Sequence, residues 1–181
     1  TLGVSNQDFL ANRLNFQGAI SSGQVTNEGT LTTPSGGSIY LIGATVSNSG
    51  IITTPKGETI LAAGERVRLV DTGTPGVTVE ITGSANRATN LGDITAEAGR
   101  IGIAGALVAN SGKLNASSVV EDGGRIFLRA TKKIELADTS KISANGLAGG
   151  SITTITREKG QISGELVARG EISAQSNTPN G

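Results

Sequence analysis

The nine residues VTNEGTLTT (25–33) set a pattern that returns along the chain. The next copy, VSNSGIITT (46–54), keeps the asparagine, the glycine and the alternation of apolar with small polar residues. Four further copies follow, of which the last two have lost the asparagine: NLGDITA (90–96), VANSGKLNA (108–116), DTSKISA (138–144) and ARGEISA (168–174). The chain is therefore built on an internal repeat.

A second motif recurs between these copies. It is a glycine followed by a short run rich in β-branched residues: GSIYL (37–41), GETIL (57–61), GRIGI (99–103), GRIFL (124–128) and GSITTI (150–155). The asparagines of consecutive copies of the first motif are 20 or 21 residues apart, with one gap of 42. Apolar residues alternate in both motifs, and Gly, Asn, Ser or Pro bound them, which is typical of short strands joined by tight turns.

Short strands at a fixed period of about 20 residues predict a solenoid, in which each repeat buries its apolar edge on its neighbours. A leucine-rich repeat has a similar period, but its dense leucine pattern is missing here. The apolar positions hold mostly Ile, Val, Leu and Ala. We therefore expect an all-β fold, a right-handed parallel β-helix of about 20 residues per coil, with successive coils about 4.8 Å apart.

The repeated asparagines and glycines are expected to form a structural turn ladder. Asparagine tolerates the left-handed backbone conformation and bonds to neighbouring backbone, so it suits a corner that stacks from coil to coil. The glycines would complete the same corners. The predicted ladder consists of Asn27, Gly29, Asn48, Gly50, Asn90, Gly92, Asn110 and Gly112.

The gap of 42 residues contains two alternating segments, 66–70 and 77–81, around the turn-rich DTGTPG (71–76). A hairpin over 66–82 that leaves the wall of the helix is the favoured interpretation. One extra coil with a degenerate turn is the alternative. A longer spacing around 117–122 predicts a protruding loop.

Composition excludes several classes of function. Lys plus Arg and Asp plus Glu number 15 each, so there is no basic footprint for nucleic acid. His, Cys, Met and Trp are all absent, which removes imidazole and thiol catalysis, disulfides and the usual transition-metal ligands. No apolar run approaches the roughly 20 residues that span a bilayer. Without methionine, and without a signal segment at Thr1, we expect a processed or excised fragment.

Particular motifs carry a family resemblance. TLGVSNQDFL (1–10), FQG (16–18), GSIYLIG (37–43) and ILAAGERV (60–67) resemble the filamentous-haemagglutinin-like exoproteins of bacterial two-partner secretion. Residues 1–83 look like the C-terminal half of that family's secretion domain, and 84–181 read as further β-helical coils. The whole chain, 1–181, is expected to be a single parallel β-helix.

The resemblance implies a non-enzymatic structural and secretion module of a large secreted adhesin. Its parent would cross the outer membrane of a Gram-negative bacterium through a β-barrel transporter, its partner. It would then act at the cell surface or in the medium, in adhesion, aggregation, biofilm or virulence. We assign no catalytic, cofactor-binding or metal-ligating residue.

A glycan- or receptor-binding β-helix is the first alternative. Rows of threonine could form a flat face of hydroxyls: Thr32, Thr33, Thr53, Thr54 and Thr95. The preference of threonine for strands accounts for these rows equally well, and sugar sites usually add aromatic side chains, which are scarce here.

A polysaccharide-active enzyme is the less favoured alternative. Its best candidates are Glu121 and Asp122 near Arg125 and Arg129, because such activity needs clustered carboxylates with a basic residue. No second acidic cluster recurs one coil away, so a solvated turn before a strand is the preferred interpretation. An uncapped β-helix would also expose strand edges and associate end to end.

Overall fold

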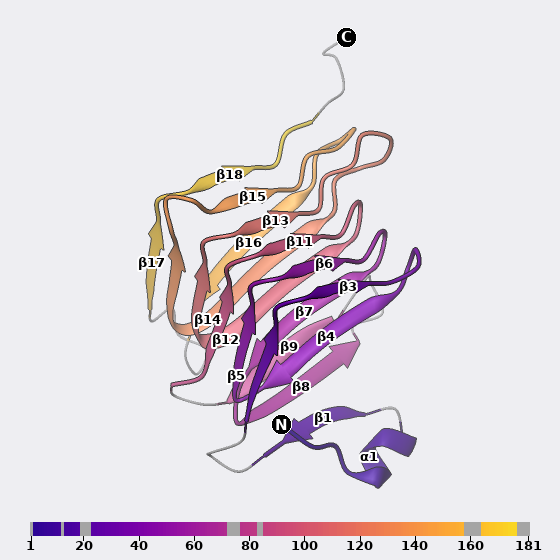
Figure 1. Cartoon of the computed structure of the whole chain (residues 1–181), viewed down its shortest axis with the longest axis vertical. Coiled ribbons are helices and arrows are strands. Elements are labelled where there is room, and N and C mark those ends of the chain that lie inside the picture. The colour runs from indigo at the N-terminus through magenta and orange to yellow at the C-terminus, as the bar shows by residue number, and fades with distance from the viewer. Residues whose placement is uncertain are drawn as a thin grey trace.

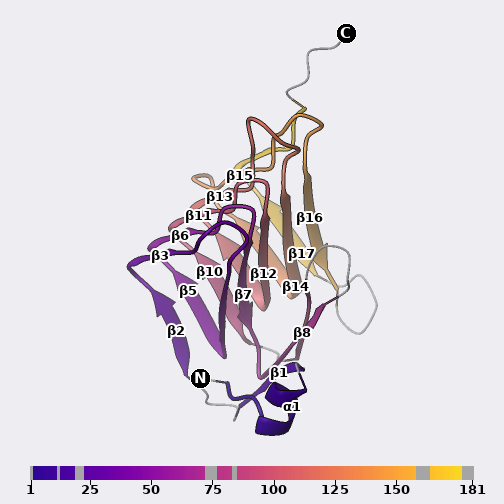
Figure 2. The ribbon, with the colours of Figure 1, turned by 90° about the vertical axis from the view of Figure 1, so that its right-hand side faces the viewer.

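The computed structural model describes residues 2–11, 13–18, 23–71, 77–82, 85–157 and 164–176. In this part of the chain short parallel strands stack along the long axis of the molecule. The helix α1 (Asn6–Leu10) and strand β1 (Leu14–Gln17) lie at one end, and the last coil lies at the other (Figures 1 and 2). No helix in the described residues is long and apolar enough to cross a membrane.

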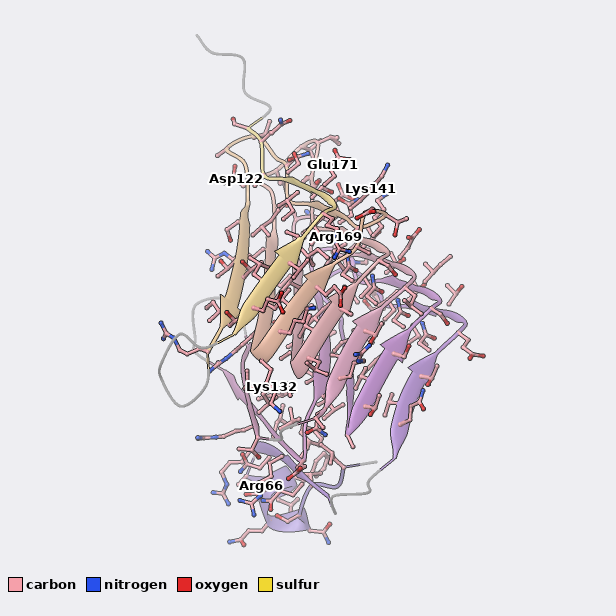
Figure 3. The ribbon with its side chains drawn as sticks, turned by 90° about the vertical axis from the view of Figure 1, so that its left-hand side faces the viewer. Arg66, Asp122, Lys132, Lys141, Arg169 and Glu171 are labelled. Carbon is pink, nitrogen blue, oxygen red and sulfur yellow. The ribbon has the colours of Figure 1, made fainter. Side chains whose placement is uncertain are left out.

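The parallel strands of the described residues form three walls, which are named here in chain order. The first wall, which faces the viewer in Figure 3, contains β2 (Gln24–Asn27), β5 (Thr45–Asn48), β10 (Arg87–Asn90), the second halves of β12 (Arg100–Asn110) and β14 (Arg125–Leu136), and β17 (Glu165–Ala168). The second wall contains β3 (Thr30–Thr32), β6 (Ile51–Thr53), β11 (Asp93–Thr95), β13 (Lys113–Asn115), β15 (Lys141–Ser143) and β18 (Glu171–Ser173). The third wall contains β4 (Ser38–Gly43), β7 (Glu58–Ala63), the first halves of β12 and β14, and β16 (Ser151–Thr156). The prediction of an all-β chain with parallel sheets is confirmed.

The strand register shows which residues of successive sequence repeats stack on one another. Asn27 pairs with Asn48 and Asn90 pairs with Asn110, at spacings of 21 and 20 residues. Asn110 pairs with Leu136, because β14 is preceded by the longer loop that contains 117–122. Sequence repeats therefore stack on their counterparts, while the length of a coil varies with its loops.

Inward side chains form aliphatic stacks along the axis. In the second wall Ile52, Ile94, Leu114 and Ile142 lie in register and are fully buried. Burying each such side chain contributes about 1.5–3 kcal/mol relative to leaving it in water. In the last coil the equivalent residue, Ile172, is 46% exposed. The core is thus dry in the central coils and open at the last one.

An antiparallel sheet stands outside the three walls. Strand β8 (Arg66–Asp71) pairs with β9 (Val77–Thr82) on one side and with β1 on the other. The expected turn at 72–76 lies outside the described residues. Asn48 pairs directly with Asn90, so no separate coil lies between these two strands. The antiparallel pair is inserted within one enlarged coil.

This sheet covers the outer side of the third wall. Ile60 and Ala62 face away from the helix interior but are fully buried, because Val67 and Leu69 of β8 pack on them together with Phe16 of β1. A second, smaller core therefore lies outside the helix, and it accounts for the burial of β7 along its whole length.

The repeated asparagines do not have the left-handed backbone conformation. Among the described residues the non-glycine positions with positive φ are Lys56 and Ala98. The asparagines of the predicted ladder instead end strands of the first wall in extended conformation. The tolerance of asparagine for the left-handed conformation is therefore not used here; these side chains bond to one another and to the neighbouring backbone.

The ladder glycines are required by close approach of the coils. A Cβ added to Gly50 would meet the carbonyl oxygen of Gly29 far inside contact distance, and one added to Gly92 would meet that of Gly50 in the same way. Gly112 stands in the same relation to Gly92. Gly29, in the first described coil of this corner, has open space where its Cβ would be. Stacking, not left-handed geometry, therefore selects glycine here.

Replacing Gly50 by alanine should destabilise the chain by about 2 kcal/mol or more, because the neighbouring backbone must move. Gly29→Ala is the matched control and should change the free energy of unfolding by less than about 0.5 kcal/mol. Urea denaturation followed by circular dichroism measures both. Equal effects of the two substitutions would contradict the close-approach explanation.

Candidate functional site

The ladder asparagines form a buried row of amide hydrogen bonds. Asn27 Nδ2 donates to Asn48 Oδ1 at 2.7 Å, and Asn48 Nδ2 donates to Asn90 Oδ1 at 2.8 Å. The row continues from Asn90 Nδ2 to Asn110 Oδ1 at 2.8 Å and ends at Ser140 Oγ, 2.6 Å from Asn110 Nδ2. These asparagines are between 0% and 7% exposed, so the row is screened from water.

Each interior amide also holds its own corner. Asn48 and Asn90 donate a second hydrogen bond from Nδ2 to the carbonyl oxygens of Gly50 and Gly92, at 3.2 and 2.9 Å. An amide can accept one bond and donate two at once, which neither a carboxylate nor a hydroxyl can do. The row therefore ties adjacent coils together and fixes the turn that leaves each strand. Its role in the described residues is structural.

Asn90→Ala should cost about 2–4 kcal/mol, because it leaves buried polar groups on both neighbouring asparagines without a partner. Asn27→Ala, at the end of the row, removes the donor to one neighbour only and should cost about 1 kcal/mol. Chemical denaturation of the two variants compares these values. A smaller loss for Asn90→Ala than for Asn27→Ala would show that the row does not act in this way.

A polar cluster lies on the outer side of the third wall. Tyr40 Oη donates to Glu58 Oε2 at 2.8 Å, and Arg100 Nη1 lies 2.8 Å from Glu58 Oε1. The Arg100 guanidinium also lies over the Phe127 ring, 5.7 Å from its centre. The side chains of Arg100 and Glu58 are 19% and 10% exposed. The cluster holds one arginine in a fixed position at the surface.

Glycine at position 102 makes this cluster possible. Gly102 pairs in register with Phe127, and a Cβ at Gly102 would collide with the aromatic ring. The ring therefore lies across the glycine, where Arg100 can cover it. Arg100 and Arg125 are themselves neighbours in register on β12 and β14.

Tyr40 should titrate above the usual tyrosine value. Burial raises the pKa of Tyr40 above 10.0, a bond from Ser38 opposes this, and the bond to Glu58 raises it further. Because the folded-state pKa is the higher one, the contribution to stability is complete below about pH 10. It is lost as the pH rises through the pKa of the folded state.

The chain has one tyrosine, so its phenolate absorbance can be followed directly. We expect the native midpoint to lie above that in 8 M urea, with Tyr40→Phe abolishing the signal. A Glu58→Gln variant should lower the native midpoint, because the charge beside the phenol is removed. A native midpoint at or below the denatured one would contradict the described burial.

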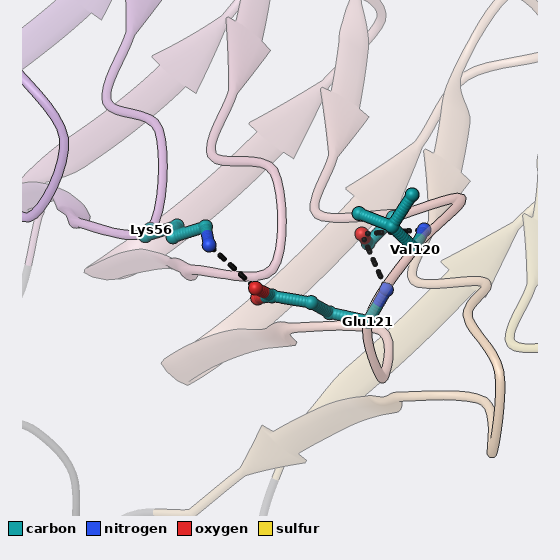
Figure 4. Close-up of polar contacts among 4 residues, drawn as sticks. Lys56, Val120 and Glu121 are labelled. Carbon is teal, nitrogen blue, oxygen red and sulfur yellow. Dashed lines mark hydrogen bonds and ion pairs between the residues drawn. The ribbon is translucent and has the colours of Figure 1, made fainter.

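Glu121 and Asp122, the acidic pair considered for catalysis, have structural partners. Glu121 Oε1 lies 2.5 Å from Lys56 Nζ (Figure 4), and this bond raises the pKa of Lys56. The main-chain N–H groups of Val120 and Glu121 donate to Ser118 Oγ, and Asp122 Oδ1 accepts from the Ala148 N–H.

Neither acid forms an ion pair with Arg125 within the described residues, and there no three His, Cys, Asp or Glu side chains meet in a way that could hold a metal ion. The two carboxylates thus stabilise the loop that precedes β14.

The threonines considered for a flat face do not all lie on one surface. Thr32, Thr53 and Thr95 lie in register along the second wall and are at least partly exposed. Thr54 is fully buried and shares a 2.9 Å hydrogen bond with Thr59. The alternative of one flat face that holds both Thr53 and Thr54 is therefore not supported, because Thr54 is buried while Thr53 is partly exposed.

Two adjoining grooves lie over the third wall and its corner. The larger, of about 650 Å³, is lined by Arg100, Asp122, Arg125, Phe127, Arg129 and Ser151 among others. The smaller, of about 300 Å³, shares Arg100 and Arg125 and reaches Lys56 and Glu58. Sequence reasoning missed this site, although the GRI triplet that opens both 99–103 and 124–128 was a signal for it.

Comparison with solved structures shows that this fold is similar to a known one. The crystal structure of the HMW1 secretion domain from Haemophilus influenzae is similar to this chain, with a TM-score of 0.75 and 27% sequence identity. The similarity covers 97% of this chain and 57% of that one, so this chain spans a little over half the length of that domain. No family model and no curated protein matches. The likeness supports the resemblance to two-partner secretion exoproteins, without distinguishing among members of that group.

Proposed function

We propose that this chain is a non-enzymatic structural and secretion module of a large bacterial adhesin of the filamentous-haemagglutinin-like type. The observation that carries the proposal is the structural similarity to a secretion domain over nearly the whole chain. The partners found for Glu121 and Asp122 agree with it, because both carboxylates are engaged in holding a loop.

In this proposal the chain is a single right-handed helix of about 20 residues per coil. Residues 1–83, with the inserted antiparallel strands at 66–82, correspond to the latter part of a secretion domain. Residues 84–181 are further coils of the same helix. The in-register stacking of β10 through β15 on the preceding coils supports this continuity.

The fold suits a protein that crosses a membrane unfolded and folds as it emerges. Each coil completes its hydrogen bonds on the coil before it, so folding can advance one coil at a time. In the last described coil Leu166 and Ile172 are half exposed, because no further coil covers them within the described residues. The absence of cysteine means that no disulfide can form early and obstruct passage.

The partner in this proposal is an outer-membrane β-barrel transporter, engaged through the parent protein. The mature protein is then secreted or held on the surface of a Gram-negative cell, where it acts in adhesion or aggregation. The exposed apolar side chains of the last coil would also allow end-to-end self-association of an isolated fragment.

A chimera tests the proposal. The matching segment of the HMW1 secretion domain is replaced by this chain, and release of the domain into the medium through the Haemophilus influenzae transporter is measured. Release comparable to that of the unmodified domain is expected. Gly50→Val in the chimera should reduce release, because a side chain at Gly50 would collide with the backbone of Gly29 and block stacking.

Retention in the periplasm of a chimera whose purified form has the β-helical circular dichroism spectrum would refute the secretion role. Folding is scored separately, so a misfolded chimera is not mistaken for that result.

A further inference from the structure

We propose that the two adjoining grooves over the third wall bind a linear, negatively charged polysaccharide that lies along the helix axis. Such binding goes beyond the secretion role, which requires no ligand. The name "basic groove" is used below for the two grooves together, with Arg100 and Arg125 at their shared boundary.

Alternation on β14 places the key side chains on one surface. Arg125, Phe127 and Arg129 occupy every second position and line the basic groove, while Ile126 and Leu128 between them are buried in the helix core. One strand therefore presents an arginine, an aromatic ring and a second arginine in sequence. Guanidinium groups bind carboxylate and sulfate through paired N–H groups, and a ring offers an apolar platform to a sugar.

Positive charge at the boundary is only partly compensated. Arg100 and Arg125 are neighbours in register, an arrangement in which like charges repel. Glu58 pairs with Arg100, but the exposed Arg125 side chain has no hydrogen bond or ion pair among the described residues. Arg100 Nε is buried and also has no acceptor there. An anion between the two guanidinium groups would relieve the repulsion and bond to both.

The linings of the two grooves hold more basic than acidic side chains: Lys56, Arg100, Arg125 and Arg129 against Glu58 and Asp122. Asp122 Oδ1 accepts a hydrogen bond from the Ala148 N–H, which turns it to the neighbouring loop. Glu58 is held between Tyr40 and Arg100. The acids of the basic groove thus have protein partners, while Arg125 faces solvent.

The spacing between equivalent residues of successive coils in the third wall favours a polysaccharide over a peptide as the ligand. Arg100, Arg125 and Ser151 follow one another in register, one per coil, at the strand spacing of about 4.8 Å. That spacing is close to the length of one pyranose unit in an extended chain. An extended peptide advances about 3.3 Å per residue, so its side chains would fall out of step with the coils. The hydroxyls of Ser151 and Thr153 line the same surface and can bond to sugar hydroxyls.

Calorimetric titration of the 181-residue chain tests the proposal. The ligands are tetragalacturonate, a sulfated chondroitin tetrasaccharide, neutral maltotetraose and a tetraglutamate peptide. At least one anionic tetrasaccharide should bind, with an affinity that falls as salt is added. Comparing the two identifies which anionic group is preferred, and binding by either supports the proposal.

Arg125→Gln should weaken that binding about tenfold, the usual effect of one charge-assisted hydrogen bond. Arg169→Gln is the matched control, because Arg169 is also exposed but lies after β17 and lines neither groove (Figure 3). Both positions are exposed, so both variants should keep the circular dichroism spectrum of the parent.

Three results would overturn the proposal. They are no binding by either anionic tetrasaccharide, equal binding by maltotetraose or tetraglutamate, and equal weakening by the two substitutions. Equal binding by tetraglutamate would indicate that charge alone is recognised.

Discussion

Each strand in the middle of the walls finds its hydrogen-bond partners in the coils before and after it, and this constraint shapes the rest of the molecule. Equivalent residues must then lie directly over one another, about 4.8 Å apart. An apolar stack such as Ile52, Ile94 and Leu114 satisfies this spacing by close packing. A polar stack satisfies it only if each member both donates and accepts, as Asn48 and Asn90 do. At the adjoining corner the same proximity leaves no room for a side chain.

The sequence was sufficient to predict the all-β class, the parallel sheets and the equivalence of the repeated asparagines, because a parallel stack repeats its chemistry at each turn. It indicated only part of the reason why asparagine is used. The bonds from these side chains to neighbouring backbone were expected and occur, whereas positive φ occurs instead at Lys56 and Ala98. A residue's own preferences do not reveal a hydrogen bond to its counterpart 20 or 42 residues away, as between Asn90 and Asn110 or Asn48 and Asn90.

Contacts outside the repeat were the hardest to predict. The alternation of apolar and polar residues in 66–82 suggested a pair of strands. No feature of residues 14–17 predicted that β1 would pair with the edge of that pair. The burial of Ile60 and Ala62 follows from that long-range packing and has no local signature. The alternative of a threonine face put Thr53 and Thr54 on one surface, and the burial of Thr54, directly after β6, cannot be read from the sequence. The arginines of the third wall were present in the repeated GRI triplet, but their meaning depended on seeing them in register.

Stacking of coil on coil makes the middle of the described stack dry and leaves its last described coil partly exposed. Native-state hydrogen exchange, measured residue by residue, tests this most directly. The account predicts the greatest protection for the amides of β10, β11 and the second half of β12, which lie between two complete coils, and lower protection in β17 and β18. Protection in β17 and β18 equal to that of the central strands, or stronger protection of β8 and β9 than of β12, would contradict the account.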